Sequence, residues 1–153
     1  MKTKKYLLLF FLVALCFSDC KKYPDGPWFS FRSKDARIIG NWTVESYLIN
    51  NVDSISKFIC TDCSFKHKGR SYIVGSDCLG DGGWDLRNHK KEIWIYFQWQ
   101  TGYPIPKGPF PVTDFDSTWT HSSLSWEIQR LTTTQMWLKV NFNSKEYYIK
   151  FKS

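Results

Sequence analysis

The chain contains no apolar run long enough to cross a bilayer as a helix. Its longest apolar stretch, residues 6–17, has 12 residues, whereas a membrane-spanning helix needs about 20. This stretch follows Lys2, Lys4 and Lys5, and a short basic segment before an apolar one is typical of an export signal. We therefore expect residues 1–19 to be removed. Removing 19 of the 153 residues leaves 134, enough for one domain with a full core.

Signatures of enzymes are also missing. The three histidines are far apart and none lies in an H-E-x-x-H spacing, and the glycine-rich residues 80–83 lack the Lys and Ser or Thr of a phosphate loop. No G-x-S-x-G occurs. Asp114 and Asp116 form a possible carboxylate pair, but they lie in a turn-rich segment where aspartate is common. We therefore predict a protein that is not an enzyme, with no cofactor and no metal ion.

Basic residues are in excess but are not gathered on one element. The formal net charge of the whole chain is +7. Without residues 1–19 it becomes +5, because 3 of the 21 basic and 1 of the 14 acidic groups are lost. The lysines are scattered, which favours solvated strand faces and hairpin tips over a phosphate-binding surface. We do not expect a nucleic-acid partner.

The end of the apolar stretch contains two cysteines, Cys16 and Cys20. Lys21 and Lys22 follow Cys20 directly, so a polar tether begins there, whereas Phe17 follows Cys16. The segment around Cys20 resembles the lipobox of bacterial lipoproteins, although Asp19 replaces the usual small residue. The resemblance implies cleavage before Cys20, lipidation (palmitate) of that residue, and attachment to the cell envelope, at the outer membrane and facing the periplasm. Cys16 remains the rival site.

From Trp42 onward, apolar and polar residues alternate with a period of two, which predicts half-buried strands. Ser33 is expected to cap a helical turn over residues 34–37 before the first strand. We expect eight strands, near residues 42–48, 57–67, 70–76, 82–88, 92–99, 123–131, 135–142 and 146–152. Because most connections are hairpin-like, these strands predict an all-β fold, an eight-stranded antiparallel up-and-down barrel.

The apolar residues of these strands are expected to point inward, as in a water-soluble barrel; an outer-membrane barrel would reverse the pattern. In the first strand Tyr47 is expected on the outer face. The inward positions are Trp42, Val44, Ser46, Leu48, Tyr72, Trp84, Phe97, Trp99, Leu124, Trp126, Ile128, Met136, Leu138, Val140, Phe142, Tyr147, Ile149 and Phe151.

Gly40, Asn41 and Trp42, directly after the expected helical turn, resemble the G-x-W motif of lipocalins. Segments 20–24, 32–42, 82–86 and 128–138 are also similar to bacterial lipocalin-like lipoproteins of unassigned ligand, which have a calycin-type β-barrel. The resemblance implies a signal peptide over 1–19, a tether and entry turn over 20–36, and a barrel over 37–153. In that family the tryptophan closes one end of the barrel, a role it would give to Gly40 and Trp42. No arginine follows the last strand, and an open β-sandwich remains the alternative fold.

The connection over residues 100–122 is the irregular part of the chain. It contains four prolines and four large aromatic residues, and loops of such length are usually functional or disordered. We expect it to fold back over the outward rings of Trp94 and Tyr96 or across the barrel mouth. Two roles for this connection remain as alternatives: it covers the strand structurally, or it forms a lid over a ligand.

The interior is expected to be lined by rings, which suits a small apolar or ring-containing ligand. The residues expected nearest to such a ligand are Trp99, Tyr103, Phe110, Trp119 and Trp126. The alternative is recognition of a glycan or a protein, as an inhibitor would do, through the 100–122 connection, with no internal ligand. Glycan binding predicts coplanar exposed rings. The oligomeric state is left open.

Once Cys16 is removed and Cys20 acylated, three cysteines remain. A hairpin bent around Gly69 would place Cys60 opposite Cys78, which predicts a disulfide between them and a free, buried Cys63. A zinc site formed by the three cysteines and His67 is the alternative.

Two serines are candidates for modification. Ser54 and Ser117 each follow an aspartate and resemble sites of bacterial O-glycosylation. The alternative interpretation is that both serines lie in polar turns and are not modified.

Overall fold

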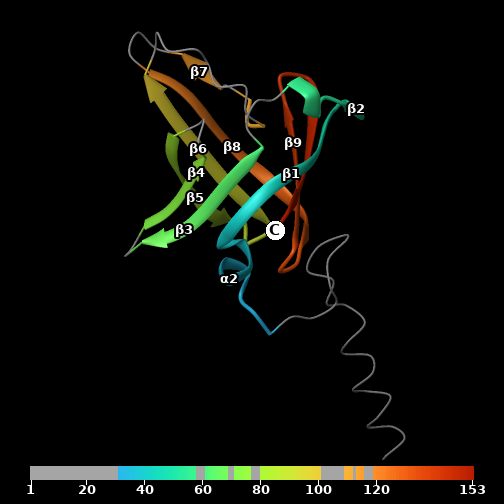
Figure 1. The fold of residues 1–153 in the computed structure, drawn as a ribbon. Helices are drawn as coiled ribbons and strands as arrows, with labels where there is room; N and C mark the ends of the chain where they lie inside the picture. The colour runs from blue at the N-terminus through green and yellow to red at the C-terminus, as the bar shows by residue number, and fades with distance from the viewer. Residues whose placement is uncertain are drawn as a thin grey trace, which may run out of the picture.

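The structure, a computed structural model, describes residues 31–57, 61–68, 71–76, 80–100, 109–111, 113–115 and 119–153. Most of these residues lie in β-strands (Figure 1). The elements are α2 (Lys34–Ile38), β1 (Gly40–Ile49), β2 (Val52–Asp53), a 3₁₀ turn (Ile55–Lys57), β3 (Asp62–Lys68), β4 (Ser71–Ser76), β5 (Gly80–Arg87), β6 (Glu92–Gln100), β7 (Asp114–Phe115), β8 (Trp119–Leu131), β9 (Gln135–Phe142) and β10 (Lys145–Lys152). No helix in the described residues has the length and hydropathy of a membrane span.

The strands form one antiparallel sheet. Eight long strands follow one another in the order β10, β9, β8, β6, β5, β4, β3, β1, with β2 beside β1 and β7 beside β8. Residues 40–43 of β1 pair with β3, and residues 43–49 pair with β10. The predicted all-β class and antiparallel meander are confirmed. The eight predicted strands correspond to the eight long ones, although β3 begins at Asp62, because Ile55–Lys57 forms a 3₁₀ turn.

The inner face of the sheet carries the core, and most inward positions are those that the alternation predicts. On β8, β9 and β10, the predicted inward residues either are buried or pack against the buried core. The fully buried members of this set include Trp126, Met136, Leu138, Ile149 and Phe151. Burial of these apolar side chains is the main favourable term that holds the sheet together.

Two irregularities in register change which residues face the core. A shift between Val44 and Ser46 moves Tyr47 inward, where it is 2 % exposed, and leaves Leu48 half-buried. The prediction that Ser46 and Leu48 point inward and Tyr47 outward was therefore wrong, because one extra residue in a strand reverses the faces that follow. A second shift, between Ile128 and Arg130, places Leu131 in the core.

The long connection is shorter than the predicted residues 100–122. Strand β8 begins at Trp119, because Trp119 to Ser122 pair with the second half of β6. Within the connection, β7 pairs with β8 through Asp114 and Phe115. Strand β7 lies at the end of the sheet opposite to α2 (Figure 1).

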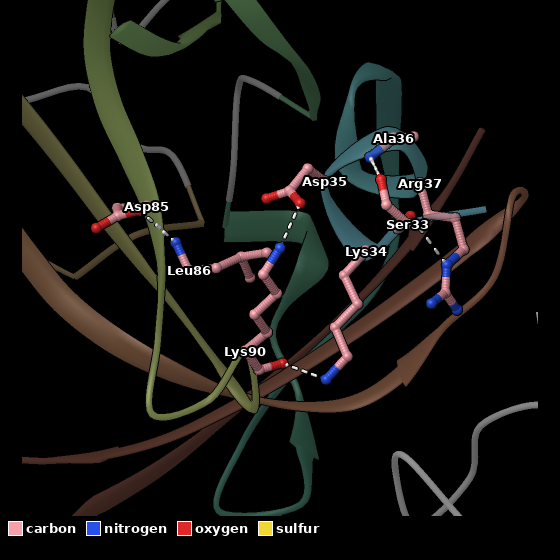
Figure 2. Close-up of polar contacts among 8 residues, drawn as sticks. All are labelled: Ser33, Lys34, Asp35, Ala36, Arg37, Asp85, Leu86 and Lys90. Atoms are coloured by element: carbon pink, nitrogen blue, oxygen red, sulfur yellow. Dashed lines mark hydrogen bonds and ion pairs between the residues drawn. The ribbon is translucent and has the colours of Figure 1, made fainter. Parts of the chain in front are cut away.

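The predicted helical turn is present as α2 and covers one end of the sheet. The Ser33 hydroxyl accepts a hydrogen bond from the Ala36 amide, as expected of an N-cap. Ile38 is fully buried in the core. At the hairpin between β5 and β6, the Lys34 ammonium donates to the carbonyl oxygen of Lys90 at 2.8 Å, and Lys90 forms an ion pair with Asp35 at 2.6 Å (Figure 2). The entry turn is thus part of the folded domain.

Candidate functional site

Phe110 inserts its ring into the core from the connection between β6 and β8. Its side chain is 4 % exposed. Its ring centroid lies 5.2 Å from that of Phe97, 5.9 Å from that of Trp126 and 6.4 Å from that of Phe151. These three rings belong to β6, β8 and β10, so Phe110 sits in an aromatic cage built by three strands. Such contacts stabilise ring pairs beyond the area that they bury.

The connection is also fixed to β8 next to this insertion. The Thr113 amide donates to the carbonyl oxygen of His121 at 2.8 Å, and the Ser123 amide donates to the Thr113 hydroxyl at 3.0 Å. Phe110 therefore enters the interior three residues before a segment that is anchored to β8. The expected placements were over the outward rings of Trp94 and Tyr96 or across the barrel mouth, whereas Phe110 packs among the rings of the core.

The outward rings of β6 are covered by one another and by a neighbouring arginine. Trp94 and Tyr96 are half-buried and stack with ring centroids 5.4 Å apart and planes 15° apart. The Arg87 guanidinium lies 4.3 Å from the centre of the Trp94 ring. The Trp94 indole donates to the Ser123 hydroxyl. The sequence led us to expect that the 100–122 connection covers these two rings. In the described residues they are covered by each other and by Arg87.

The predicted ligand residues are brought together only in part. Trp126 and Phe110 are in ring contact. The backbones of Trp99 and Trp119 lie one residue apart in register on the paired β6 and β8, but their side chains, and all of Tyr103, lie outside the described residues.

The end of the sheet near α2 is filled by Trp42, the tryptophan of the predicted closure motif. Trp42 is 2 % exposed, and its indole donates to the carbonyl oxygen of Ile38 at 2.7 Å. It thereby satisfies a carbonyl group that the end of α2 leaves without a partner in the helix. Gly40 begins β1 with φ of 157°, and a Cβ there would lie 3.8 Å from the Trp42 indole nitrogen. Gly40 and Trp42 thus lie together where the helix meets the sheet.

Arg37 is a residue of this end that the sequence analysis did not single out. It is buried, and its guanidinium donates to the carbonyl oxygen of Leu131 at 2.8 Å, which ties α2 to the end of β8. The second terminal nitrogen of this guanidinium is buried and has no hydrogen-bond partner among the described residues. In the lipocalin comparison an arginine was sought only after the last strand, whereas Arg37 lies before β1.

Cys63 is the cysteine that the structure describes, and it is free and buried, as predicted. Burial, reinforced by the neighbouring Asp62, raises the pKa of its thiol from 9.0 to about 12. A thiol with such a pKa is inert at neutral pH, because the thiolate is the reactive form. Burial also raises the pKa of the Tyr47 hydroxyl, with a further contribution from Tyr147.

These pKa shifts predict a protein that loses stability above about pH 9. Between pH 9 and 12 the Cys63 thiol is deprotonated in the unfolded chain but stays protonated in the folded one. The unfolded state then binds fewer protons, so each pH unit lowers the free energy of unfolding by up to about 1.4 kcal/mol per such group. We expect the urea midpoint to fall from pH 8 to pH 10.5, and to fall less in Cys63→Ala. An equal fall in both proteins would contradict this assignment.

The other sites that the sequence suggested are placed only in part. Cys20, Cys60, Cys78 and Ser117 lie outside the described residues. Strands β3 and β4 pair Lys68 with Ser71, so the hairpin is centred between residues 69 and 70. Because Cys60 and Cys78 lie outside the described residues, the disulfide between them stays a prediction. In the described residues, no cluster of three or more His, Cys, Asp or Glu could hold a metal ion.

Ser54 is buried in the structure. It is 2 % exposed, and its amide donates to the carbonyl oxygen of Tyr47 at 2.9 Å. The folded protein therefore does not present its hydroxyl to a glycosyl donor, which argues against modification at this residue after folding.

Comparison of this chain with models of protein families, with curated proteins and with solved structures finds no match. The assignment of a function therefore depends on the residues and contacts described above.

Proposed function

We propose that this protein is a lipid-anchored protein of the bacterial envelope that binds a small apolar or ring-containing molecule in or at the mouth of a lipocalin-like β-barrel. The anchor would be a lipid on Cys20, at the outer membrane and facing the periplasm. The sequence pattern supports the anchor, because a basic segment and a short apolar run precede Cys20 and a polar tether follows it. The proposal includes no catalytic step.

The pairing of β1 supports the barrel. Thr43 pairs with Asp62 of β3 and with Lys152 of β10, so the first and last long strands are neighbours. Strand β1 pairs with β3 over residues 40–43 and with β10 over residues 43–49, an arrangement that favours a barrel, in which strand edges are paired. The position of Trp42 beside α2 agrees with the end-closing role that the G-x-W resemblance implies.

The observation that carries the binding proposal is the cage around Phe110. This ring is held by Phe97, Trp126 and Phe151, yet it belongs to the connection and not to the strands that build the cage. If the connection moves away, it vacates a slot with aromatic walls. A planar apolar molecule could make the same ring contacts, and sites for such ligands are mostly apolar with a few polar groups. Phe110 would then be a plug that a ligand displaces.

This proposal is tested by the affinities of the wild type and of Phe110→Ala for indole, measured by isothermal titration calorimetry. In the wild type indole must displace the Phe110 ring, whereas the variant leaves the cage open. We expect Phe110→Ala to bind indole at least about tenfold more tightly, since a vacated apolar cavity remains dry and accepts a ring. Native mass spectrometry of the protein from its own envelope is expected to reveal a bound small molecule.

Phe65→Ala is the matched control. Phe65 is fully buried and contacts Trp84 on β5, so its removal opens a cavity of similar size formed by strands alone. An equal gain of indole affinity in both variants would show that any cavity suffices. That result, together with a ligand-free native mass, would contradict the binding proposal.

Recognition of a glycan is the second candidate. Trp94 and Tyr96 present half-buried rings on the outer face, but sugars bind to open ring faces, and here the two rings stack on each other with Arg87 over Trp94. These rings also belong to β6 and not to the 100–122 connection on which the alternative was based. Loss of binding to envelope polysaccharide in Trp94→Ala, with indole binding unchanged, would favour this candidate.

A further inference from the structure

Basic side chains gather at the end of the sheet that α2 covers. They come from the start of the described chain and from the hairpin between β5 and β6. This surface, called the basic end below, consists of Phe31, Arg32, Lys34, Arg87, Lys90 and Lys91. Four carboxylates share this end: Asp35 pairs with Lys90, Asp85 accepts from the Leu86 amide, Glu92 accepts from Asn88, and Glu127 lies opposite Glu92 and Lys139 in register.

The two segments of the basic end are held together. The Lys34 ammonium donates to the carbonyl oxygen of Lys90, and the Lys90 ammonium reaches back to Asp35 (Figure 2). At the tip of the hairpin, Asn88, His89 and Lys90 adopt left-handed φ values of 48°, 52° and 64°. The turn therefore presents its side chains from a defined backbone beside the point where the chain enters the domain.

An apolar ring accompanies these cations. Phe31 is 99 % exposed, the largest exposure among the large apolar residues described. Phe31 directly precedes Arg32 in the chain. An exposed ring accompanied by basic residues is the combination found where proteins meet a membrane, because the ring enters the headgroup layer and the cations pair with lipid phosphates.

The position of the anchor brings this same end towards the bilayer. Ten residues separate Cys20 from Phe31. At no more than about 3.6 Å per residue, this length of chain limits the distance between the lipid and the α2 end to roughly 40 Å. Strand β1, with 10 residues, is about 33 Å long. Because the chain enters the domain at the α2 end of β1, the opposite end lies a strand length farther from the attachment point.

We infer that the basic end rests on the anionic headgroups of the membrane that holds the lipid anchor, so that the end carrying β7 points away from it. This inference depends on the proposed lipidation of Cys20. It adds an orientation: the connection that carries Phe110 would open towards the aqueous side and not towards the lipid.

The test is amide hydrogen exchange of the full-length protein, purified from its own membranes and reconstituted in vesicles. One set of vesicles contains phosphatidylcholine alone, and the other contains roughly one third phosphatidylglycerol. We expect peptides that cover residues 31–35 and 87–91 to exchange about fivefold more slowly in the anionic vesicles, the effect of one basic side chain near such a surface. High salt is expected to abolish the difference.

Lys91→Glu and Lys145→Glu are the matched variants, because both residues are exposed and both changes reverse one charge. Lys145 begins β10 beyond the far end of β1, where Ile49 pairs with Tyr147. In Lys91→Glu we expect peptides 31–35 and 87–91 to exchange equally fast in both kinds of vesicle. In Lys145→Glu we expect them still to exchange more slowly in the anionic vesicles.

The mass of the intact protein separates the two proposals. Acylated protein with the same exchange in both kinds of vesicle would overturn the orientation and leave the anchor standing. Equal loss of protection in both charge-reversal variants would overturn it as well. Protein without acyl chains would refute the anchor, while protection by anionic vesicles would still support the basic end as a lipid-binding surface.

Discussion

Replacement of Gly82 by alanine is expected to lower the free energy of unfolding by about 3 kcal/mol. Gly82 lies in β5 opposite Phe97, and a Cβ at this position would overlap the backbone carbonyl oxygen of Tyr96. It would also lie 3.1 Å from a carbon of the Phe97 ring. Because a backbone atom cannot swing aside as a side chain does, β5 and β6 would have to separate. Thermal unfolding followed by circular dichroism should show a midpoint lower by roughly 10 °C.

The double variant Gly82→Ala/Phe97→Leu distinguishes the two contacts. If the backbone of Tyr96 is the obstacle, a smaller side chain at residue 97 gives no relief, and the double variant should be at least as unstable as Gly82→Ala. Recovery of stability in the double variant would show that the Phe97 ring was the obstacle.

Replacement of Trp42 is the second change with a large expected effect. Trp42→Ala removes a ring that is 2 % exposed, and such truncations cost about 3–5 kcal/mol. Trp42→Phe keeps most of the ring but removes the donor to the Ile38 carbonyl oxygen, which is then buried without a partner. An unsatisfied buried group costs about 1–3 kcal/mol. Urea unfolding should therefore rank the wild type above Trp42→Phe and Trp42→Ala last.

Trp94→Phe serves as the control for the lost hydrogen bond. The Trp94 indole also donates a hydrogen bond, but to the hydroxyl of Ser123 at an exposed site, where water can replace it. We expect its loss to cost less than about 1 kcal/mol. Equal losses in Trp42→Phe and Trp94→Phe would mean that the bond to Ile38 does not hold α2 in place.

Much of the strand framework could be predicted from local sequence. On β9, alternation from Met136 to Phe142 places every second residue on the inner face, and no irregularity interrupts it. The N-cap at Ser33 could also be predicted from neighbouring residues, because it needs only the Ser33 hydroxyl and the amide of Ala36 three residues later.

The errors arose where the chain departs from a strict period of two. The shift in β1 follows from how β1 aligns with β10, so nothing in the segment around Tyr47 and Leu48 announces it. Ring insertion by Phe110 was unpredictable for a similar reason. Its partners Phe97 and Phe151 lie 13 and 41 positions away in sequence, and only the fold brings the three together.

The pairing of β1 with β10 has a consequence for how the protein acquires its structure. Thr43 and Lys152 are partners although 109 positions separate them, whereas most other strand pairs are neighbouring hairpins. Hairpins can form early, but this long-range contact must wait until the intervening strands are ordered, which slows folding. During that delay β1 and β10 each keep an unpaired edge that can accept a strand from another molecule. Crowded nascent or refolding chains are therefore expected to aggregate through these two strands.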